Sequence, residues 1–227
     1  NLYFLLQDSG EQLALDPEDV ASPAVSPWIR YLWGHLHERQ GNTGKALEHY
    51  LSVLQDLPRD PWVHLRTGIL QEQQGEQEQA LLHYKTASEA YPDSFRILFR
   101  RSIVTMNLLQ EEESIRIHQK MIELRPEHAL SLNNLAWMYL TAKDRSLRQP
   151  EKALELALKS VELEATIDHI DTLAEAYFQT GQTGKAIETL RKGIREASYP
   201  KSRERYLEGQ YRRFRKGDTS VSPPPVS

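Results

Sequence analysis

The 227-residue sequence contains no cysteine, which excludes disulfide bonds, thiolate metal sites and cysteine nucleophiles. It also has no apolar run long enough to span a membrane. The glycine-containing stretches 41–45 and 181–185 lack the four-residue spacer and the preceding strand of a phosphate-binding loop. The eight histidines show no metal-ligand spacing, and we expect them on the surface or in a binding groove. We therefore predict no catalytic residue, no metal and no cofactor, and we do not expect an enzyme.

The strongest signal that the sequence does contain is self-similarity at a period of about 34 residues, which is typical of a helix–turn–helix repeat. Pro58, Pro92 and Pro126 follow one another at this interval, and Tyr50 and Tyr84 keep the same spacing. Such a unit is stacked on copies of itself, because one unit cannot bury its apolar face alone.

The copy between residues 61 and 94 shows why the unit is helical. Gly68 and Ala80 are small, so two antiparallel helices can approach closely, and Tyr84 follows Ala80 by one turn on the same face. Gly75 falls where the first helix must end and the chain must turn. Pro92 ends the second helix, since proline disfavours helix in the residue before it.

This pattern resembles the tetratricopeptide repeat family, whose signature is W-x₂-L-G-x₂-Y…A-x₃-F…P. Ala80 and Tyr84 match the A-x₃-F element, while Leu135-Ala136 and Tyr139 match L-G-x₂-Y in a later copy. The stretch from Asn133 to Trp137 is similar to the C-terminal repeats of bacterial members. The resemblance implies an all-α fold: an α-solenoid of about five helical hairpins in a right-handed superhelix, with a C-terminal capping helix.

The period also sets the expected domain limits. We expect an irregular lead-in at 1–26 and a repeat domain at 27–199, with repeats at roughly 27–60, 61–94, 95–128, 129–166 and 167–199. The third copy has Ser102 and Ser114 where a small Gly or Ala is usual, and the fourth has an insertion at 143–148. A basic amphipathic capping helix at 200–216 and a disordered tail at 217–227 complete the chain.

The predicted capping helix lies in a strongly basic stretch. Residues 191–216 hold ten Lys or Arg against three Glu, a charge of +7 in a chain whose net charge is −4. Leu207, Tyr211 and Phe214 form an apolar stripe at helical spacing, which suits packing on the last repeat better than stacking on bases. We expect a cap first, and as a second interpretation a contact with an acidic surface.

A binding groove is predicted from the resemblance, because the first helix of each tetratricopeptide repeat lines the concave face. Asp168, Asp171 and Glu175 would make the far end of this groove acidic. The aromatic centre predicts a peptide- or helix-binding surface, with burial of the rings in the core as the alternative. The predicted groove residues are Trp28, Tyr31, Trp62, Leu65, Ile69, Arg96, Phe99, Ile103, Asn133 and Trp137.

The function that follows is a non-catalytic protein–protein interaction scaffold with a protein or peptide partner. Two alternatives stay open: a self-assembling structural repeat protein, and an assembly factor of a bacterial envelope or secretion machine. We expect no nucleic-acid partner. We expect membrane contact only through a missing N-terminal anchor. The apolar residues 1–6 fit a native segment, an anchor stub or a protease-site scar, so a periplasmic, membrane-tethered or cytoplasmic location stays open.

Overall fold

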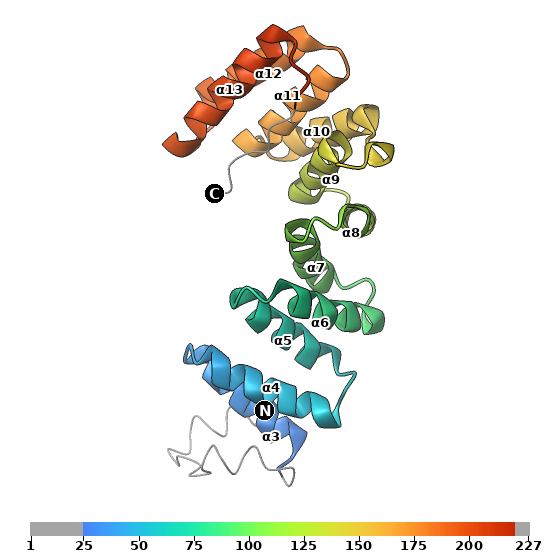
Figure 1. Cartoon of the computed structure of the whole chain (residues 1–227), viewed down its shortest axis with the longest axis vertical. Coiled ribbons are helices and arrows are strands. Elements are labelled where there is room, and N and C mark those ends of the chain that lie inside the picture. Colours follow the sequence, from blue (N-terminus) through green and yellow to red (C-terminus); the bar gives the residue numbers. More distant parts are fainter. Residues whose placement is uncertain (1–24, 221–227) are drawn as a thin grey trace. The chain divides into compact units, whose positions relative to one another are not determined.

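The computed structural model describes residues 25–220 of the chain (Figure 1). The apolar segment 2–6, most of the expected lead-in and the end of the expected tail lie outside the described residues. Within 25–220 the backbone forms α-helices and two short 3₁₀ helices, with no strand. These elements are α3 (Pro27–Arg39), α4 (Thr43–Asp56), α5 (Pro61–Gln73), α6 (Gln77–Ala90), α7 (Phe95–Asn107), α8 (Glu111–Leu124), α9 (Ala129–Thr141), η1 (Arg145–Leu147), α10 (Pro150–Leu163), α11 (Ile167–Gln179), α12 (Thr183–Glu196), η2 (Lys201–Arg203) and α13 (Glu204–Lys216).

The chain divides into two compact units, with the division inside α7 between Val104 and Thr105. In the first unit α3 packs against α4 and α5 against α6, each pair forming an antiparallel hairpin (Figure 1). In the second unit α9 packs against α10 and α11 against α12 in the same way. Each hairpin therefore packs against its neighbours and buries there the apolar surface that it cannot bury alone.

Local chemistry fixes where the helices begin and end. Pro61 opens α5, where its missing N–H is not needed, and the side chain of Asp60 accepts hydrogen bonds from two backbone N–H groups of the first turn. Gly75 follows α5 with φ of 83°, a left-handed conformation that glycine adopts without steric cost. Leu109, which lies one repeat period after Gly75, takes the same region with φ of 55°. The third repeat therefore makes its turn with a strained residue.

The small residues of the repeat mark places where two helices touch. A Cβ added to Gly68 would lie 2.7 Å from the Tyr84 ring, and one added to Gly34 would lie 2.7 Å from the Tyr50 ring. Both tyrosines are fully buried. The glycine of the first helix and the tyrosine of the second thus form one packing unit, which is why they recur together at the same period.

The insertion in the fourth repeat is short and ordered. It contains η1, and the Glu111 carboxylate accepts hydrogen bonds from the backbone N–H groups of Lys143 at 2.8 Å and Asp144 at 3.3 Å. The side chain of Asp144 in turn accepts from the Ser146 N–H at 2.9 Å. These contacts join the loop to the start of α8.

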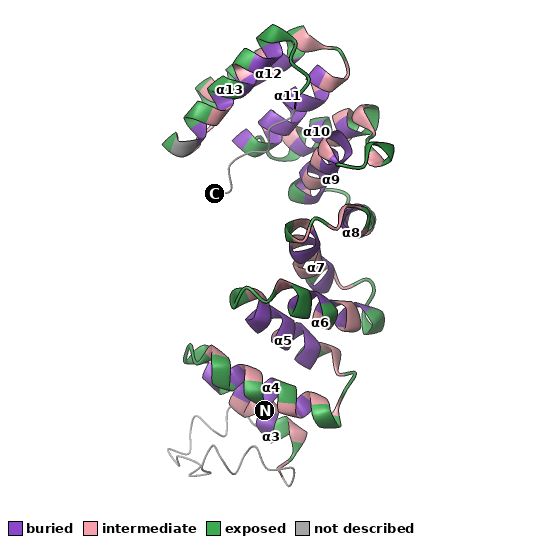
Figure 2. Cartoon of the chain, in the orientation of Figure 1, coloured by how far each residue is buried: buried purple, intermediate pink, exposed green. Residues whose placement is uncertain are grey.

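Helix α13 packs on the last hairpin. Leu207 and Phe214 are almost completely buried, and the Phe214 ring stacks on that of Phe178 at 4.7 Å. Ala186 and Leu190 of α12 belong to the same apolar cluster. Figure 2 shows α13 buried along one side and exposed along the other, as expected for a helix that covers the apolar end of a stack.

Candidate partner-binding surface

Two tryptophans at the start of successive repeats stay exposed. Trp28 on α3 is 63% exposed and Trp62 on α5 is 47% exposed, and they lie one repeat period apart. Trp28 meets Tyr31 edge to face with ring centroids 6.5 Å apart, while Trp62 lies 5.5 Å from the half-exposed ring of Tyr91. Each indole thus rests on a second aromatic ring and still presents a large apolar area to solvent.

The other predicted residues of the first unit differ in exposure. Leu65 and Ile69 are 1% and 6% exposed, so they contribute packing rather than open surface. Arg96 is exposed, whereas Phe99 and Ile103 are half-buried. The open part of the predicted surface is therefore concentrated at the N-terminal ends of α3, α5 and α7.

Asn133 and Trp137 belong to the second unit, on α9. Asn133 is 7% exposed, and its side-chain oxygen is buried without a hydrogen-bond partner. Trp137 is half-buried. The structure thus brings eight of the ten predicted residues into the first unit and leaves these two in the second.

A charged contact joins the first helices of neighbouring repeats. The Glu38 carboxylate of α3 accepts a hydrogen bond of 2.8 Å from the Tyr50 hydroxyl. It accepts a second, of 3.0 Å, from the Arg66 guanidinium of α5. Glu38 therefore links its own hairpin to the next one.

The same contact recurs in the next repeat. The Glu72 carboxylate accepts a 2.5 Å hydrogen bond from the Tyr84 hydroxyl and lies 3.7 Å from the Arg100 guanidinium of α7. Burial, together with the hydrogen bond to Glu72, raises the pKa of Tyr84, so the hydroxyl stays a donor. These contacts connect α3 to α5 and α5 to α7, the helices that carry the predicted groove residues of the first unit.

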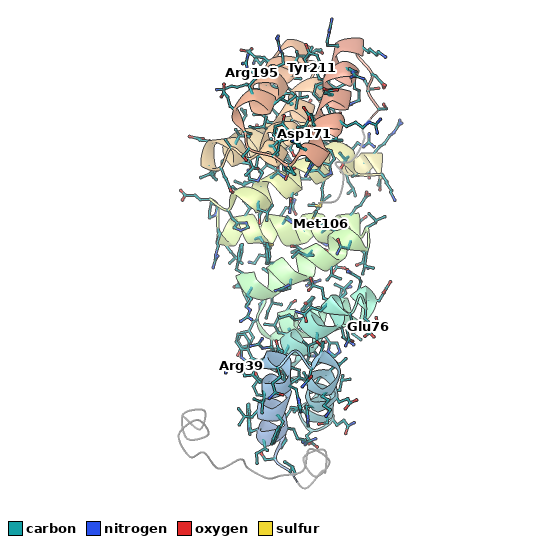
Figure 3. All side chains as sticks on the ribbon, turned by 90° about the vertical axis from the view of Figure 1, so that its left-hand side faces the viewer. Arg39, Glu76, Met106, Asp171, Arg195 and Tyr211 are labelled. Carbon is teal, nitrogen blue, oxygen red and sulfur yellow. The ribbon has the colours of Figure 1, made fainter. Side chains whose placement is uncertain are left out.

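The predicted acidic end of the groove is wrong for Asp171 and Glu175, whereas the Asp168 side chain is 53% exposed. Asp171 and Glu175 are 4% and 1% exposed because α13 covers them. The Tyr206 hydroxyl donates to Asp171 at 2.8 Å, and the Arg213 guanidinium pairs with Glu175. Burial raises the pKa of Asp171 to about 7, although the Tyr206 bond acts in the opposite direction. Figure 3 places Asp171 within the second unit, so these carboxylates serve packing and are not open to a partner.

The expectation of surface histidines is also wrong for most of them. Five histidines are buried: His37, His49, His64, His118 and His169. Two pairs meet between helices, His37 stacking on His49 at 5.4 Å and His64 facing His83 with Nδ1 atoms 2.7 Å apart. These rings fill the space between paired helices, as apolar side chains do elsewhere.

We expected neither a metal site nor a membrane-spanning helix. The structure can be searched for both only in the residues that it describes. Among residues 25–220, no three His, Cys, Asp or Glu side chains converge on a point where they could hold a metal ion. No helix in this range combines the length and the apolar character needed to cross a membrane.

The comparisons with known proteins identify the repeat. Tetratricopeptide repeat models match residues 31–95 and 171–198. The chain therefore contains tetratricopeptide repeats in these two ranges. No curated protein sequence gives a significant match.

Solved structures show the same fold at low sequence identity. A crystal structure of MamA protein superposes with a TM-score of 0.64 at 17% identity, covering 87% of this chain and 98% of that one. MamA from Desulfovibrio magneticus RS-1 gives 0.63 at 18% identity, covering 74% and 93%. A tetratricopeptide repeat protein from Parabacteroides merdae gives 0.68 at 16% identity, covering 84% and 73%. The predicted all-α solenoid is confirmed.

The basic outer side of the capping helix was expected to contact an acidic surface in the second interpretation, but the recess on it was not predicted from the sequence. The recess lies on α13, and one of its wall residues is Gly209, which no neighbouring side chain covers. A full period after Ala174 falls on Glu208, so the repeat pattern gave no signal for Gly209, which is the next residue. The face consists of Arg205, Gly209, Arg212 and Lys216.

Proposed function

We propose that this protein is a non-catalytic scaffold that binds a peptide segment or a helix of a partner protein on the first unit. The observation that carries the proposal is the pair of exposed tryptophans, Trp28 and Trp62, at equivalent places in adjacent repeats. Large apolar side chains left in water at a regular spacing are typical of an interaction surface. Tryptophan is also among the residues that dominate binding energy at interfaces.

The surroundings of the two rings support the same proposal. Glu38 and Glu72 fix the adjacent helices, so the tryptophans stand on a rigid base and lose little freedom on binding. Arg96 is exposed at the start of the next first helix, and Phe99 and Ile103 follow it on α7. A partner segment that runs across α3, α5 and α7 would contact the two indole rings first and the positive charge of Arg96 last.

The test begins with a displayed peptide library selected on the full-length protein. The strongest peptide is then titrated while acrylamide quenching of tryptophan fluorescence is recorded. We expect bound peptide to shield the exposed indoles, and we expect this shielding to disappear in the Trp28→Phe, Trp62→Phe double variant. Unchanged quenching at saturating peptide would show that the bound surface lies elsewhere.

Self-association is a second candidate, and a separate observation favours it. Ile29 and Leu36 on α3 are 37% and 42% exposed and lie two turns apart, on one side of the helix. This side would suit the same face of a second copy. Sedimentation velocity over a concentration series tests it: a dimer that dissociates in Leu36→Glu supports the candidate, and a monomer at all concentrations rejects it.

A further inference from the structure

Helix α13 has the features of a first helix whose second helix is missing. In the first two repeats the glycine of the first helix is covered by a tyrosine ring of the second, 2.7 Å from a Cβ built on Gly34 or Gly68. In α13 a full period after Ala174 falls on the exposed Glu208, and Gly209 is the next residue. A Cβ built on Gly209 meets no atom of the described residues within 4 Å. Among the described residues, no second helix covers this side of α13.

The other side of α13 is already used. Leu207 and Phe214 pack into the apolar cluster of the last hairpin, and Arg213 pairs with the buried Glu175. Arg203, just before the helix, pairs with Asp168 at 2.5 Å. These contacts fix the rotation of α13 about its axis, so Gly209 is held outward.

The open face is basic and hollow. Arg205, Gly209, Arg212 and Lys216 follow one another at i, i+4, i+7 and i+11, which places them on one side of a helix. They line a recess of about 390 Å³ together with Tyr206, Gln210, Arg213, Asp218 and Ser220. Gly209 is therefore one wall residue of a recess that also holds several cationic side chains.

We propose that this face binds an acidic helix of a partner protein, which takes the place of the missing second helix. Gly209 carries no side chain that would hold an approaching helix away from α13. The basic side chains select for carboxylates on that helix. The site lies in the second unit and does not depend on the tryptophan surface.

The acids around the face favour a protein helix over a phosphate polymer. Glu208 pairs with Arg212 at 3.0 Å, and both side chains are more than half exposed. An exposed pair of this kind stabilises little, so Arg212 can exchange it for a carboxylate of the partner. Glu208 and Asp218 would repel a continuous phosphate backbone, whereas a helix presents separate charges that can avoid them.

The probe is a synthetic peptide built on residues 76–91 of this chain with Lys85→Glu. This peptide keeps Ala80 and Tyr84, the pattern that packs on Gly68, and it is acidic. Its binding to the full-length protein is measured by fluorescence anisotropy, next to a scrambled peptide of identical composition. We expect the ordered peptide to bind at least tenfold more tightly than the scrambled one.

Three variants locate the binding site. Arg205→Glu with Arg212→Glu should weaken peptide binding at least tenfold, whereas the matched control Arg191→Glu with Arg195→Glu on α12 should change it less than twofold. Gly209→Leu adds a side chain to this wall of the recess and should weaken binding at least fivefold. Because the site is open, Gly209→Leu should not lower the melting temperature, which separates a blocked site from a damaged fold.

Several outcomes would overturn the proposal. Equal binding of the scrambled peptide would mean that charge alone acts, and no binding at millimolar peptide would mean that the face holds no helix. Tighter binding of oligothymidylate, lost in the Arg205→Glu, Arg212→Glu variant, would assign the face to nucleic acid. A dimer that the same variant dissociates, without peptide binding, would assign the face to a second copy.

Discussion

The Tyr84 hydroxyl donates a 2.5 Å hydrogen bond to the Glu72 carboxylate, in the interior of the second hairpin. Tyr50 and Glu38 make the same bond at 2.8 Å in the first hairpin. The tyrosine ring packs on the glycine of its own repeat, while the glutamate reaches an arginine of the next. One hydrogen bond therefore connects packing within a repeat to packing between repeats.

Breaking this bond should cost more than breaking an exposed ion pair. Tyr84→Phe leaves the Glu72 carboxylate short of a donor, and we expect a loss of about 1–2 kcal/mol in the free energy of unfolding. Glu112→Gln removes an exposed contact to Arg116 and should change it by under about 0.5 kcal/mol. Urea denaturation measures both, and a double-mutant cycle of Tyr84→Phe with Glu72→Gln should show coupling. Additive effects would mean that the two groups act independently.

Alanine should have opposite effects at two glycines. Gly68→Ala brings a Cβ to 2.7 Å from the buried Tyr84 ring, and overpacking of this kind typically costs about 1–3 kcal/mol. Gly209→Ala meets no atom within 4 Å and should stabilise by about 0.5–1 kcal/mol through helix propensity. Thermal denaturation of the two variants compares them, and a tolerated Gly68→Ala would show that the hairpin can open.

The turn of the third repeat should improve when leucine is replaced by glycine. Leu109 has φ of 55° and is 62% exposed, so its side chain contributes little packing while its backbone is strained. We expect Leu109→Gly to stabilise by about 1 kcal/mol, because the left-handed conformation costs a residue with a Cβ roughly 1–2 kcal/mol. Leu109→Ala keeps the strain and is the control. A glycine variant no more stable than the alanine variant would contradict the account.

A fall in pH should lower the stability of the first unit through His83, whose ring faces that of His64. Burial, and then the charge of His64, lower the pKa of His83 from 6.5 to about 4. The unfolded chain therefore binds more protons between these values, so the contribution of His83 is complete above pH 6.5 and is lost as the pH falls toward 4. Melting temperatures at pH 7 and pH 5 should differ less in His83→Asn than in the wild type. An equal difference in both would show that His83 does not contribute to the pH dependence in this range.

The repeat period was sufficient to predict the fold. Pro61, Gly75 and Pro92 lie where the structure begins α5, turns the chain and has ended α6. These are local signals, since proline and glycine act through their own backbone conformations. The period also indicated that Ala80 and Tyr84 share a face, because neighbours at helical spacing do so. It did not indicate that this tyrosine ring meets the glycine of the first helix.

The exposure of the candidate site could not be predicted in the same way. Leu65 is buried and Trp62 is half exposed, although both occupy groove places of the same helix. Glu175 is covered by Arg213 of the last helix, through a contact that follows no repeat spacing. Burial of this kind depends on how whole helices pack, which a pattern of residue types along one helix does not contain.

The affinity of Trp62→Ala for a partner peptide decides whether the exposed tryptophans form the binding surface. The matched control is Leu82→Ala, which removes a 65% exposed apolar side chain from the second helix of the same repeat. With a peptide selected on the wild-type protein, we predict at least a tenfold loss of affinity for Trp62→Ala, about 1.4 kcal/mol or more. We predict less than a twofold loss for Leu82→Ala, and both variants should melt cooperatively like the wild type. Equal affinities for the two variants, or unfolding of Trp62→Ala, would contradict the account.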